Sequence, residues 1–418
     1  MDPTTHTAPG RPTALVNDAD FMADPFATYA EWRQAGPVHR TRTPDGAWVW
    51  LVTRYDDVRA ALADPTLSLN RKNARPGGYH GFSLPPALDA NLLNLDPPDH
   101  TRLRRLVSTA FTRVRIEALR PLVQQHTDAL LTELLAGTGR ADLISAFAAP
   151  LPIAVISDLL GIPPGNRADF RTWTNTLITP DPGQPAAARQ ALSDMLRFLT
   201  RLIADKRTDP RDDLITAMLT ARDEHDHLSE SELLSLTFLL LWAGYENSVH
   251  LIGNALLALL THPEQAATLD PGSPVPSQAL GEFLRFADPN QYAIRRFPTE
   301  DITISGVTIP AGDTVLLSLA SANRDPDRFP HPETLDLTRS DNPHLSFGAG
   351  IHYCLGAPLA RLEAEIALGT MLRRLPDLTL ATPADQLRWR PSFRSRGLHE
   401  LPVTFTPAAV GRLPIPGS

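Results

Sequence analysis

One long apolar segment constrains the fold of this 418-residue chain more than any other feature. Ser229 and Glu232 form the S-x-x-E capping box that marks a helix start, and an apolar run follows directly. A helix over residues 230–260 extends roughly 46 Å at ~1.5 Å per residue, enough to cross the whole protein. A membrane span is the other interpretation, but the middle of the run carries side chains that are costly in lipid, namely Glu246, Asn247, His250 and Asn254. We therefore predict a buried central helix.

The overall composition is that of a globular protein. Hydrophobic residues make up 42% of the chain and charged residues 21%, and the formal net charge is −8. No basic block indicates a nucleic-acid partner, although a local basic face is compatible with this total. The single cysteine excludes an intrachain disulfide framework and fits a reducing compartment, so we expect a cytoplasmic protein. Residues 1–21 contain no apolar core of signal-peptide length, which argues against secretion and against an N-terminal membrane anchor.

The pattern along the chain predicts a mainly α fold with small β-sheets. Length alone suggests two or three domains, but we find no repeat and no linker, and we expect a flexible N-terminal segment over 1–20 and a single domain over 21–418. Helical spacing of apolar residues is found over 24–34, 55–63, 100–111, 116–135, 151–160, 166–178 and 186–206. Strand-like stretches are fewer, at 48–53, 302–304, 307–309, 314–319 and 401–405. The irregular stretch 65–98 counts against a compact domain unless it is functional.

The densest chemical signal surrounds Cys354, in the segment F-G-A-G-I-H-Y-C-L-G over 347–356. Its first two glycines permit a tight loop with positive φ that can lie against a flat ligand. A helix begins just after the cysteine, with Pro358 in its first turn, so free amides and the positive dipole end face the sulfur. That environment lowers the pKa of a thiol and stabilises the thiolate that a haem iron needs as axial ligand. The alternative is a buried structural cysteine, and the four ligands of a zinc site are not gathered nearby.

A second signal lies in the middle of the long helix. Ala243 and Gly244 leave a flat spot where a planar ligand can approach the backbone. Close packing against another helix explains these two small residues equally well.

The cysteine segment resembles the haem-binding loop F-G-x-G-x-H-x-C-x-G of the cytochrome P450 family, whose cysteine thiolate binds the haem iron. All six specified positions are matched, at Phe347, Gly348, Gly350, His352, Cys354 and Gly356. The resemblance extends in the expected order over about 24–405. It implies a cytochrome P450-like fold with haem b between the long central helix and the cysteine loop. Residues 21–418 would then be one haem-thiolate catalytic domain, with Cys354 as the metal ligand.

Further motifs of the family are present. Glu282 and Arg285 match its E-x-x-R pair, and this i, i+3 spacing lets the two side chains pair on one helix face. The resemblance implies a structural role for them beneath the haem. The two haem propionates need basic partners, which the resemblance assigns to His100, Arg104, Arg296 and His352.

The long helix resembles the oxygen-activating helix of the family, typically A-G-x-E/D-T-T. Ala243, Gly244 and Glu246 match, but Asn247 stands where threonine is usual, and Ser248 follows. Cleavage of the O–O bond needs protons, which a hydroxyl relays and an amide relays poorly. We expect Glu246 to supply acid–base function through ordered water. Asn247, Ser248, a water or a substrate hydroxyl would replace the usual alcohol.

A second departure concerns the third partner of the E-x-x-R pair, usually Arg or His in this family. Thr334 occupies that position in the segment P-E-T-L, and Arg328 is the candidate substitute.

The resemblance also implies where substrate binds. Contacts are expected from the stretch 65–98, the proline break near Pro180, the long helix, the stretch after Arg285 and a C-terminal turn. The candidate pocket residues on that map are Leu239, Trp242, Ala243, Tyr292, Ile294, Arg394 and Ser395. Ordinary core packing is an equal alternative for the apolar ones. Arg394 either faces solvent or indicates a substrate with a carboxylate or many oxygens.

The resemblance uses nearly the whole chain, which leaves no segment for a flavin or ferredoxin domain. We therefore expect electrons from NAD(P)H to arrive through a separate ferredoxin and ferredoxin reductase, and we expect a monomer. A basic docking face for an acidic partner, or else a solvated helix face, is formed by Arg102, Arg105, Arg113 and Arg115.

The predicted function is that of a monooxygenase that inserts one atom of O₂ into a bulky organic substrate, such as a polyketide, by hydroxylation or epoxidation in secondary metabolism. The first alternative is oxidative coupling, desaturation or ring closure at the same haem without oxygen insertion, which Asn247 favours. The second is a non-catalytic haem-binding or sensor protein.

Overall fold

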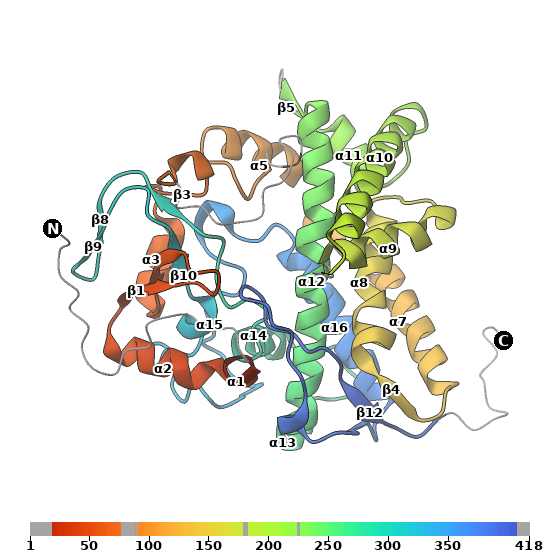
Figure 1. Ribbon diagram of the computed structural model, residues 1–418. Helices are drawn as coiled ribbons and strands as arrows, with labels where there is room; N and C mark the ends of the chain where they lie inside the picture. Colours follow the sequence, from red (N-terminus) through yellow and green to blue (C-terminus); the bar gives the residue numbers. More distant parts are fainter. Residues whose placement is uncertain (1–18, 77–87, 89–90, 179–182, 224–225, 408–418) are drawn as a thin grey trace.

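The computed structural model describes residues 19–76, 88, 91–178, 183–223 and 226–407. Helices make up most of the chain, and short strands lie around them (Figure 1). The predicted mainly α fold with small β-sheets is confirmed. Helix α1 (Ala19–Ala23) starts within the predicted N-terminal segment, whose residues 1–18 lie outside the described part.

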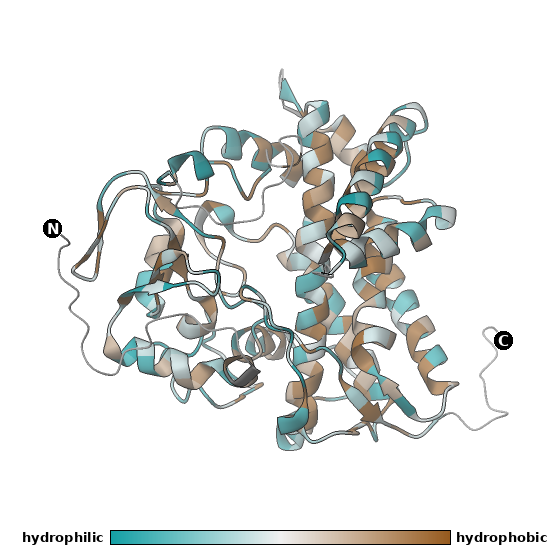
Figure 2. Cartoon of the chain, in the orientation of Figure 1, coloured by the Kyte–Doolittle hydropathy of each residue, from teal (hydrophilic) through white to brown (hydrophobic). Residues whose placement is uncertain are grey.

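The longest helix, α12 (Glu230–Thr261), runs through the middle of the molecule (Figure 1). The predicted capping box is present at its start. The Glu232 amide donates to Ser229 Oγ at 3.3 Å, and the Ser229 amide donates to Glu232 Oε2 at 2.8 Å. Most of α12 is apolar and buried (Figure 2). It ends one residue beyond the predicted limit, and its contacts on several sides make it the centre of the core.

The other helices longer than two turns are α2 (Pro25–Ala35), α3 (Tyr55–Ala63), α5 (Asp99–Ala110), α7 (Arg120–Leu135), α8 (Pro150–Leu159), α9 (Arg167–Ile178), α10 (Pro185–Thr208), α14 (Ser277–Phe286) and α16 (Ala357–Arg374). The shorter ones are α6 (Arg113–Glu117), α11 (Leu214–Thr220), α13 (Pro263–Ala266) and α15 (Leu319–Ala322). Helices α8, α10, α14 and α16 contact α12, and α7 contacts both α8 and α16. The largest hydrophobic cluster lies among these helices.

The strands form small sheets. In the first, β2 (Trp48–Val52) pairs antiparallel with β1 (Val38–Arg42) and parallel with β10 (Val315–Leu317). In the second, β12 (Pro402–Thr404) lies between β4 (Arg140–Asp142) and β11 (Thr379–Leu380). Three strand pairs complete the set: β3 (Leu67–Ser68) with β7 (Phe297–Pro298), β5 (Arg222–Asp223) with β6 (Asp226–His227), and β8 (Ile302–Ile304) with β9 (Val307–Ile309).

Two local predictions need correction. The single helix predicted over 116–135 is divided into α6 and α7, because Pro121 in the first turn of α7 has no amide to continue the earlier helix. The irregular stretch 65–98 contains β3 and a 3₁₀ turn at Arg71–Asn73, while its residues 77–87 and 89–90 lie outside the described part.

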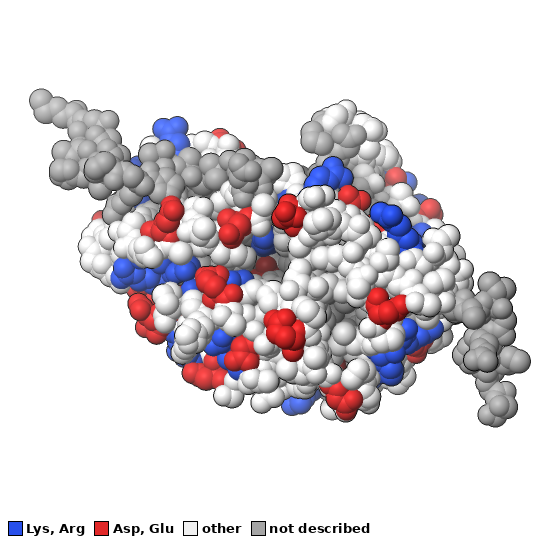
Figure 3. Space-filling model, turned by 90° about the horizontal axis from the view of Figure 1, so that it is seen from below, with Lys and Arg blue, Asp and Glu red and all other residues white. Residues whose placement is uncertain are grey.

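None of the helices in the described part of the chain combines the length and apolarity needed to cross a membrane. On the face seen in Figure 3, acidic and basic side chains are interspersed, without a large area of one sign.

Candidate active site

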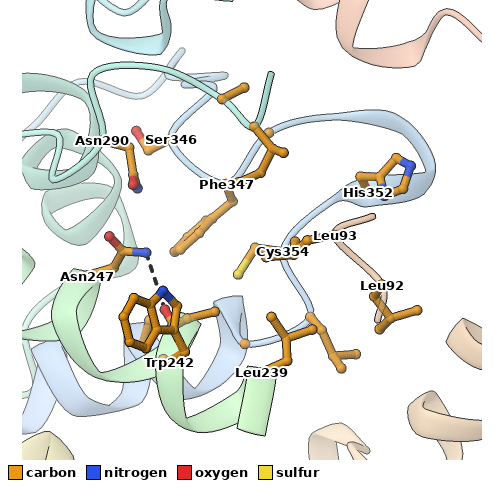
Figure 4. Close-up of a pocket in the computed structure, with 18 of the residues that line it drawn as sticks. Leu92, Leu93, Leu239, Trp242, Asn247, Asn290, Ser346, Phe347, His352 and Cys354 are labelled. Carbon is orange, nitrogen blue, oxygen red and sulfur yellow. Dashed lines mark hydrogen bonds between the residues drawn. The ribbon is translucent and has the colours of Figure 1, made fainter. Parts of the chain in front are cut away.

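A cavity lies between α12 and the loop that precedes α16 (Figure 4). Cys354 lines it from the loop, and Trp242, Ala243, Gly244 and Asn247 line it from α12. Cys354 and Gly244, 110 positions apart in the sequence, therefore meet at one cavity.

Close packing against α3 shapes the cysteine loop. Gly348 and Gly350 both have a φ of 71°, the left-handed region predicted for them. At Gly350 a Cβ atom would lie 3.0 Å from Ala63 Cα and from Leu62 O, so a side chain there has no room. The Cys354 amide donates to Phe347 O at 2.9 Å and closes the loop.

The environment of the Cys354 thiol differs in one respect from the prediction. Burial raises its pKa, while hydrogen bonds from the Gly356 and Ala357 amides and the charge of Arg104 lower it. The predicted amides at the start of α16 are present, but the net direction is upward because desolvation of the thiolate outweighs them. Coordination to a metal ion deprotonates a thiol outright, so burial does not argue against a thiolate ligand.

Beside Cys354 the structure brings together the four basic residues predicted to hold propionates: His100, Arg104, Arg296 and His352 line the same cavity. The His100 and His352 rings lie 4.1 Å apart, centroid to centroid. Arg104 donates to Tyr353 O at 2.8 Å, and Arg296 donates to Leu67 O at 3.2 Å.

Among the residues that the structure describes, these four side chains have no carboxylate partner. None of them forms an ion pair with a carboxylate among the described residues, and both ring nitrogens of His100 and Nε of Arg296 are buried without a hydrogen bond there. Burial lowers the pKa of Arg296 to about 10, against the opposing charges of Asp96 and Asp64. Burial, together with the charges of His100 and Arg296, lowers the pKa of His352 to about 3. A buried basic cluster of this kind is suited to an anionic group, and two haem propionates fit it.

Asn247 and Ser248 both have partners near the cavity. Asn247 Nδ2 donates to Ala243 O, one turn earlier, at 3.2 Å (Figure 4). Ser248 faces Glu363 on α16, whose side chain is buried. Burial raises the pKa of Glu363 to about 8, although the Ser248 hydrogen bond lowers it.

Glu246 does not line the cavity in the described structure. Its Oε1 accepts from Ser395 Oγ at 3.2 Å and lies 3.4 Å from His250 Nε2. Burial raises the pKa of Glu246, but the hydrogen bond and charge of His250, the charge of Arg394 and the Ser395 hydrogen bond outweigh it, and the net direction is downward. The carboxylate is therefore ionised at neutral pH and directed toward the C-terminal turn.

The candidate substrate residues divide into two groups. Six of the seven, Leu239, Trp242, Ala243, Tyr292, Ile294 and Arg394, line the cavity. Ser395 does not, because it is buried against Glu246. Arg394 is exposed, and the Tyr292 hydroxyl is bound to Tyr29 at 2.9 Å, so this tyrosine presents its ring. Pro180 lies outside the described residues.

The buried E-x-x-R pair is intact, but its further partner is not the residue we expected. Arg285 contacts Glu282 through two hydrogen bonds of 2.8 and 2.7 Å. Glu282 Oε2 also accepts from Arg339 Nε at 3.2 Å and from Asn342 Nδ2 at 3.0 Å. Arg328 instead pairs with the exposed Asp341 at 2.8 Å. Arg339 and Asn342 therefore take the place proposed for Arg328.

Three residues near the site escaped the sequence analysis. Asn290 lines the cavity, His250 contacts Glu246, and Glu363 contacts Ser248. His250 had a detectable signal, since it is i+4 from Glu246 on one helix. Glu363 is an acid among the buried apolar residues of α16, whereas nothing local distinguishes Asn290.

The comparisons with known proteins agree with this geometry. The family model that matches is described as Cytochrome P450 and covers residues 152–270 and 274–384. Cytochrome P450 monooxygenase PikC of Streptomyces venezuelae is 47% identical over 388 residues, 92% of each chain. Mycinamicin IV hydroxylase/epoxidase of Micromonospora griseorubida is 40% identical, over 90% of this chain and 94% of its own. The structure of the Bacillus subtilis bacillaene polyketide synthase cytochrome P450 PksS has a TM-score of 0.87 and 40% identity, over 93% of this chain and 99% of its own.

A thiol loop and basic cluster facing a long helix across a cavity define a haem-thiolate oxidoreductase. The chain belongs to the cytochrome P450 family, and it is a monooxygenase. Membership implies a haem-iron cofactor, an organic substrate, O₂, and redox partners that deliver electrons from NAD(P)H.

Proposed function

We propose that this protein binds haem b through the Cys354 thiolate and hydroxylates or epoxidises a bulky, polyketide-like substrate. The observation that carries the proposal is the basic cluster next to the only cysteine, which has no carboxylate partner in the described part of the chain. Two relatives support the reaction and the substrate class by name, one as a hydroxylase/epoxidase and one as a polyketide synthase P450.

Different residues of the site bind the haem, bind the substrate and handle protons. Cys354 holds the iron, while Arg104, Arg296, His100 and His352 bind the propionates. The haem iron, when bound, supplies the redox chemistry that reduces O₂ and oxidises the substrate. The apolar wall formed by Leu239, Trp242 and Ile294 binds substrate and excludes water. Glu246, the residue before Asn247 on α12, provides the carboxylate that accepts and donates protons.

The first experiment tests the cofactor site and the reaction separately. Arg296→Gln and His100→Phe should weaken haem retention at matched expression, as measured by the ratio of haem absorbance to protein, because each removes a propionate partner. Arg113→Gln is the matched surface control. Retention equal to wild type in both variants would contradict the propionate assignment. With ¹⁸O₂, one labelled oxygen atom should enter the product.

The second experiment concerns proton delivery beside Asn247. We propose that Asn247, Ser248, a water or a substrate hydroxyl takes the part of the missing alcohol, with Glu246 as the acid–base group. Asn247→Ala should lower the fraction of NAD(P)H electrons recovered in product, and Asn247→Thr should maintain or raise it. Unchanged coupling and rate in both variants would rule out any part for Asn247 in this step.

One further candidate reaction is supported by a specific observation. Because Asn247 lacks a hydroxyl, oxidative coupling, desaturation or ring closure without oxygen insertion is the second proposal. A product that carries no ¹⁸O would favour it over hydroxylation.

We propose a ferredoxin, reduced by a ferredoxin reductase, as electron donor to a monomeric protein in the cytoplasm. The docking face predicted from four arginines is partly neutralised. Arg102 pairs with Asp226 at 3.0 Å and with Glu232, and Arg115 pairs with Asp212 at 3.4 Å. Arg113, beside the exposed Val114, is the more available cation of this surface.

A further inference from the structure

The hydroxyl side chains that line the cavity away from the basic cluster lie against other protein groups. The Tyr292 hydroxyl is bound to Tyr29, and Ser346 Oγ donates to Leu284 O at 2.8 Å. Ser248 faces the buried carboxyl group of Glu363. These hydroxyls have little capacity left for a ligand.

Two carboxamides differ from them. The group of Asn247 that faces Ala243 O must be its NH₂, because a carbonyl oxygen only accepts. Asn247 Oδ1 therefore accepts no hydrogen bond from any residue that the structure describes. The Asn290 side chain makes no hydrogen bond to any residue that the structure describes. Its backbone is held by Asp288 Oδ1 at 2.9 Å and by a bridge to Ser395. Figure 4 shows Asn247 and Asn290 on the same side of the cavity, from α12 and from the stretch after α14.

We propose that Asn247 and Asn290 form a carboxamide pair that selects substrates carrying a hydroxyl group at this position. This inference rests on the proposed function, since it places the substrate in this cavity. Asn247 Oδ1 can be satisfied only by a donor, which excludes an ether or ketone oxygen as its partner. A hydroxyl donates to Asn247 and accepts from Asn290 at the same time. An ammonium group also donates, but Arg394 on the same cavity disfavours a second cation.

The selection has a measurable size. A ligand with an apolar group at this position covers the half-buried amide atoms without giving them partners, and sites built to bind a hydroxyl reject the analogue that lacks it. We expect the alcohol to bind about tenfold more tightly than its matched hydrocarbon.

The experiment measures binding to the haem-loaded protein by calorimetry, without turnover. The probes are matched pairs of increasing size, each an alcohol and the compound with that hydroxyl replaced by hydrogen: a cyclic monoterpene alcohol, a sesquiterpene alcohol and a hydroxylated macrolactone. In the wild type the alcohol should be preferred in at least one pair. No preference in any pair, or no binding of any alcohol, would overturn the proposal.

Three variants test whether the two asparagines cause the preference for the alcohol. Asn247→Leu and Asn290→Leu should each reduce it to about twofold or less, by weakening the alcohol alone. Leu239→Ala, at an apolar cavity residue, should weaken both members of a pair equally. An unaltered preference in both asparagine variants would also overturn the proposal. Haem absorbance and thermal unfolding report folding independently, and ¹⁸O incorporation tests the monooxygenase function separately, so a failure of the pair is distinguishable from a failure of the reaction.

Discussion

At the scale of single residues, Glu363 shows how a buried acid alters the pH dependence of stability. Its carboxyl is enclosed between α16 and α12, and Ser248 is the partner identified for it. Burial raises its pKa in the folded protein to about 8, from an ordinary value of 4.5 in the unfolded chain. Between these values the folded state binds more protons, so the contribution of Glu363 to stability falls as pH rises through this window.

Glu363→Gln removes that titration and keeps the shape of the side chain. The difference in free energy of unfolding, variant minus wild type, should increase by up to ~1.4 kcal/mol for each pH unit between pH 5 and 8. Denaturant unfolding at several pH values measures it. Glu365→Gln, on the same helix but paired with Arg120, is the control and should show no such gain. Parallel curves for Glu363→Gln and wild type would mean that the acid is ionised in the folded protein.

Local sequence predicts residues of this kind unevenly. The cysteine loop and the capping box were foreseen because their residues lie within ten positions of one another and act through backbone geometry. The orientation of Glu246 was not foreseen, because Ser395 reaches it from 149 positions away. No spacing rule connects such residues before the chain is folded.

At the scale of elements, the network around Glu282 ties α14 to the segment before the cysteine loop. Glu282 and Arg285 are fully buried, and Arg339 supplies a second cation to the same carboxylate. Arg339→Ala should lower the free energy of unfolding by about 2 kcal/mol, because it leaves a buried carboxylate short of a charged donor. Chemical denaturation measures the loss.

Arg328→Ala is the matched control for that prediction. Its partner Asp341 is largely exposed, and exposed ion pairs contribute little, so a change of about 0.5 kcal/mol or less is expected. A larger loss for Arg328→Ala than for Arg339→Ala would reverse the assignment of the third partner. Arg328 was the predicted substitute for Thr334, but the chain turns between 334 and 339 and brings Arg339 to Glu282 instead.

Helices and the local hairpin were predicted better than strands that pair with distant parts of the chain. Helices α3 and α9 and the β8–β9 hairpin follow from apolar periodicity and from the Ser305-Gly306 turn, whose two residues have positive φ. Strands β4 and β11 were missed, since three and two residues carry no alternation signal and depend on pairing with β12.

At the scale of the whole molecule, the face seen in Figure 3 mixes acidic and basic side chains, which argues against a broad electrostatic interface on that face. We expect the docking of an acidic ferredoxin to depend on few cations, because Arg102 and Arg115 already pair with carboxylates. We predict that Arg113→Glu slows electron transfer several-fold at low ionic strength and that the effect shrinks with added salt, because screening weakens the attraction. Stopped-flow reduction measures the rate.

Arg189→Glu, on α10, provides the same charge change on another helix and should leave that rate nearly unaltered. An equal slowing by both variants would indicate a response to net charge alone, and no slowing by Arg113→Glu would place the docking face elsewhere.

The residues that line the cavity come from different kinds of structure. Cys354 and its loop are fixed by positive-φ glycines and by packing on α3, whereas Ile294 and Arg394 belong to stretches outside the helices and strands. Such connecting stretches accept changes of sequence more readily than closely packed loops. Engineering can therefore vary the stretches around Ile294 and Arg394, with Arg296 kept, to change which compound is oxidised and at which carbon, while the Cys354 loop is left unchanged.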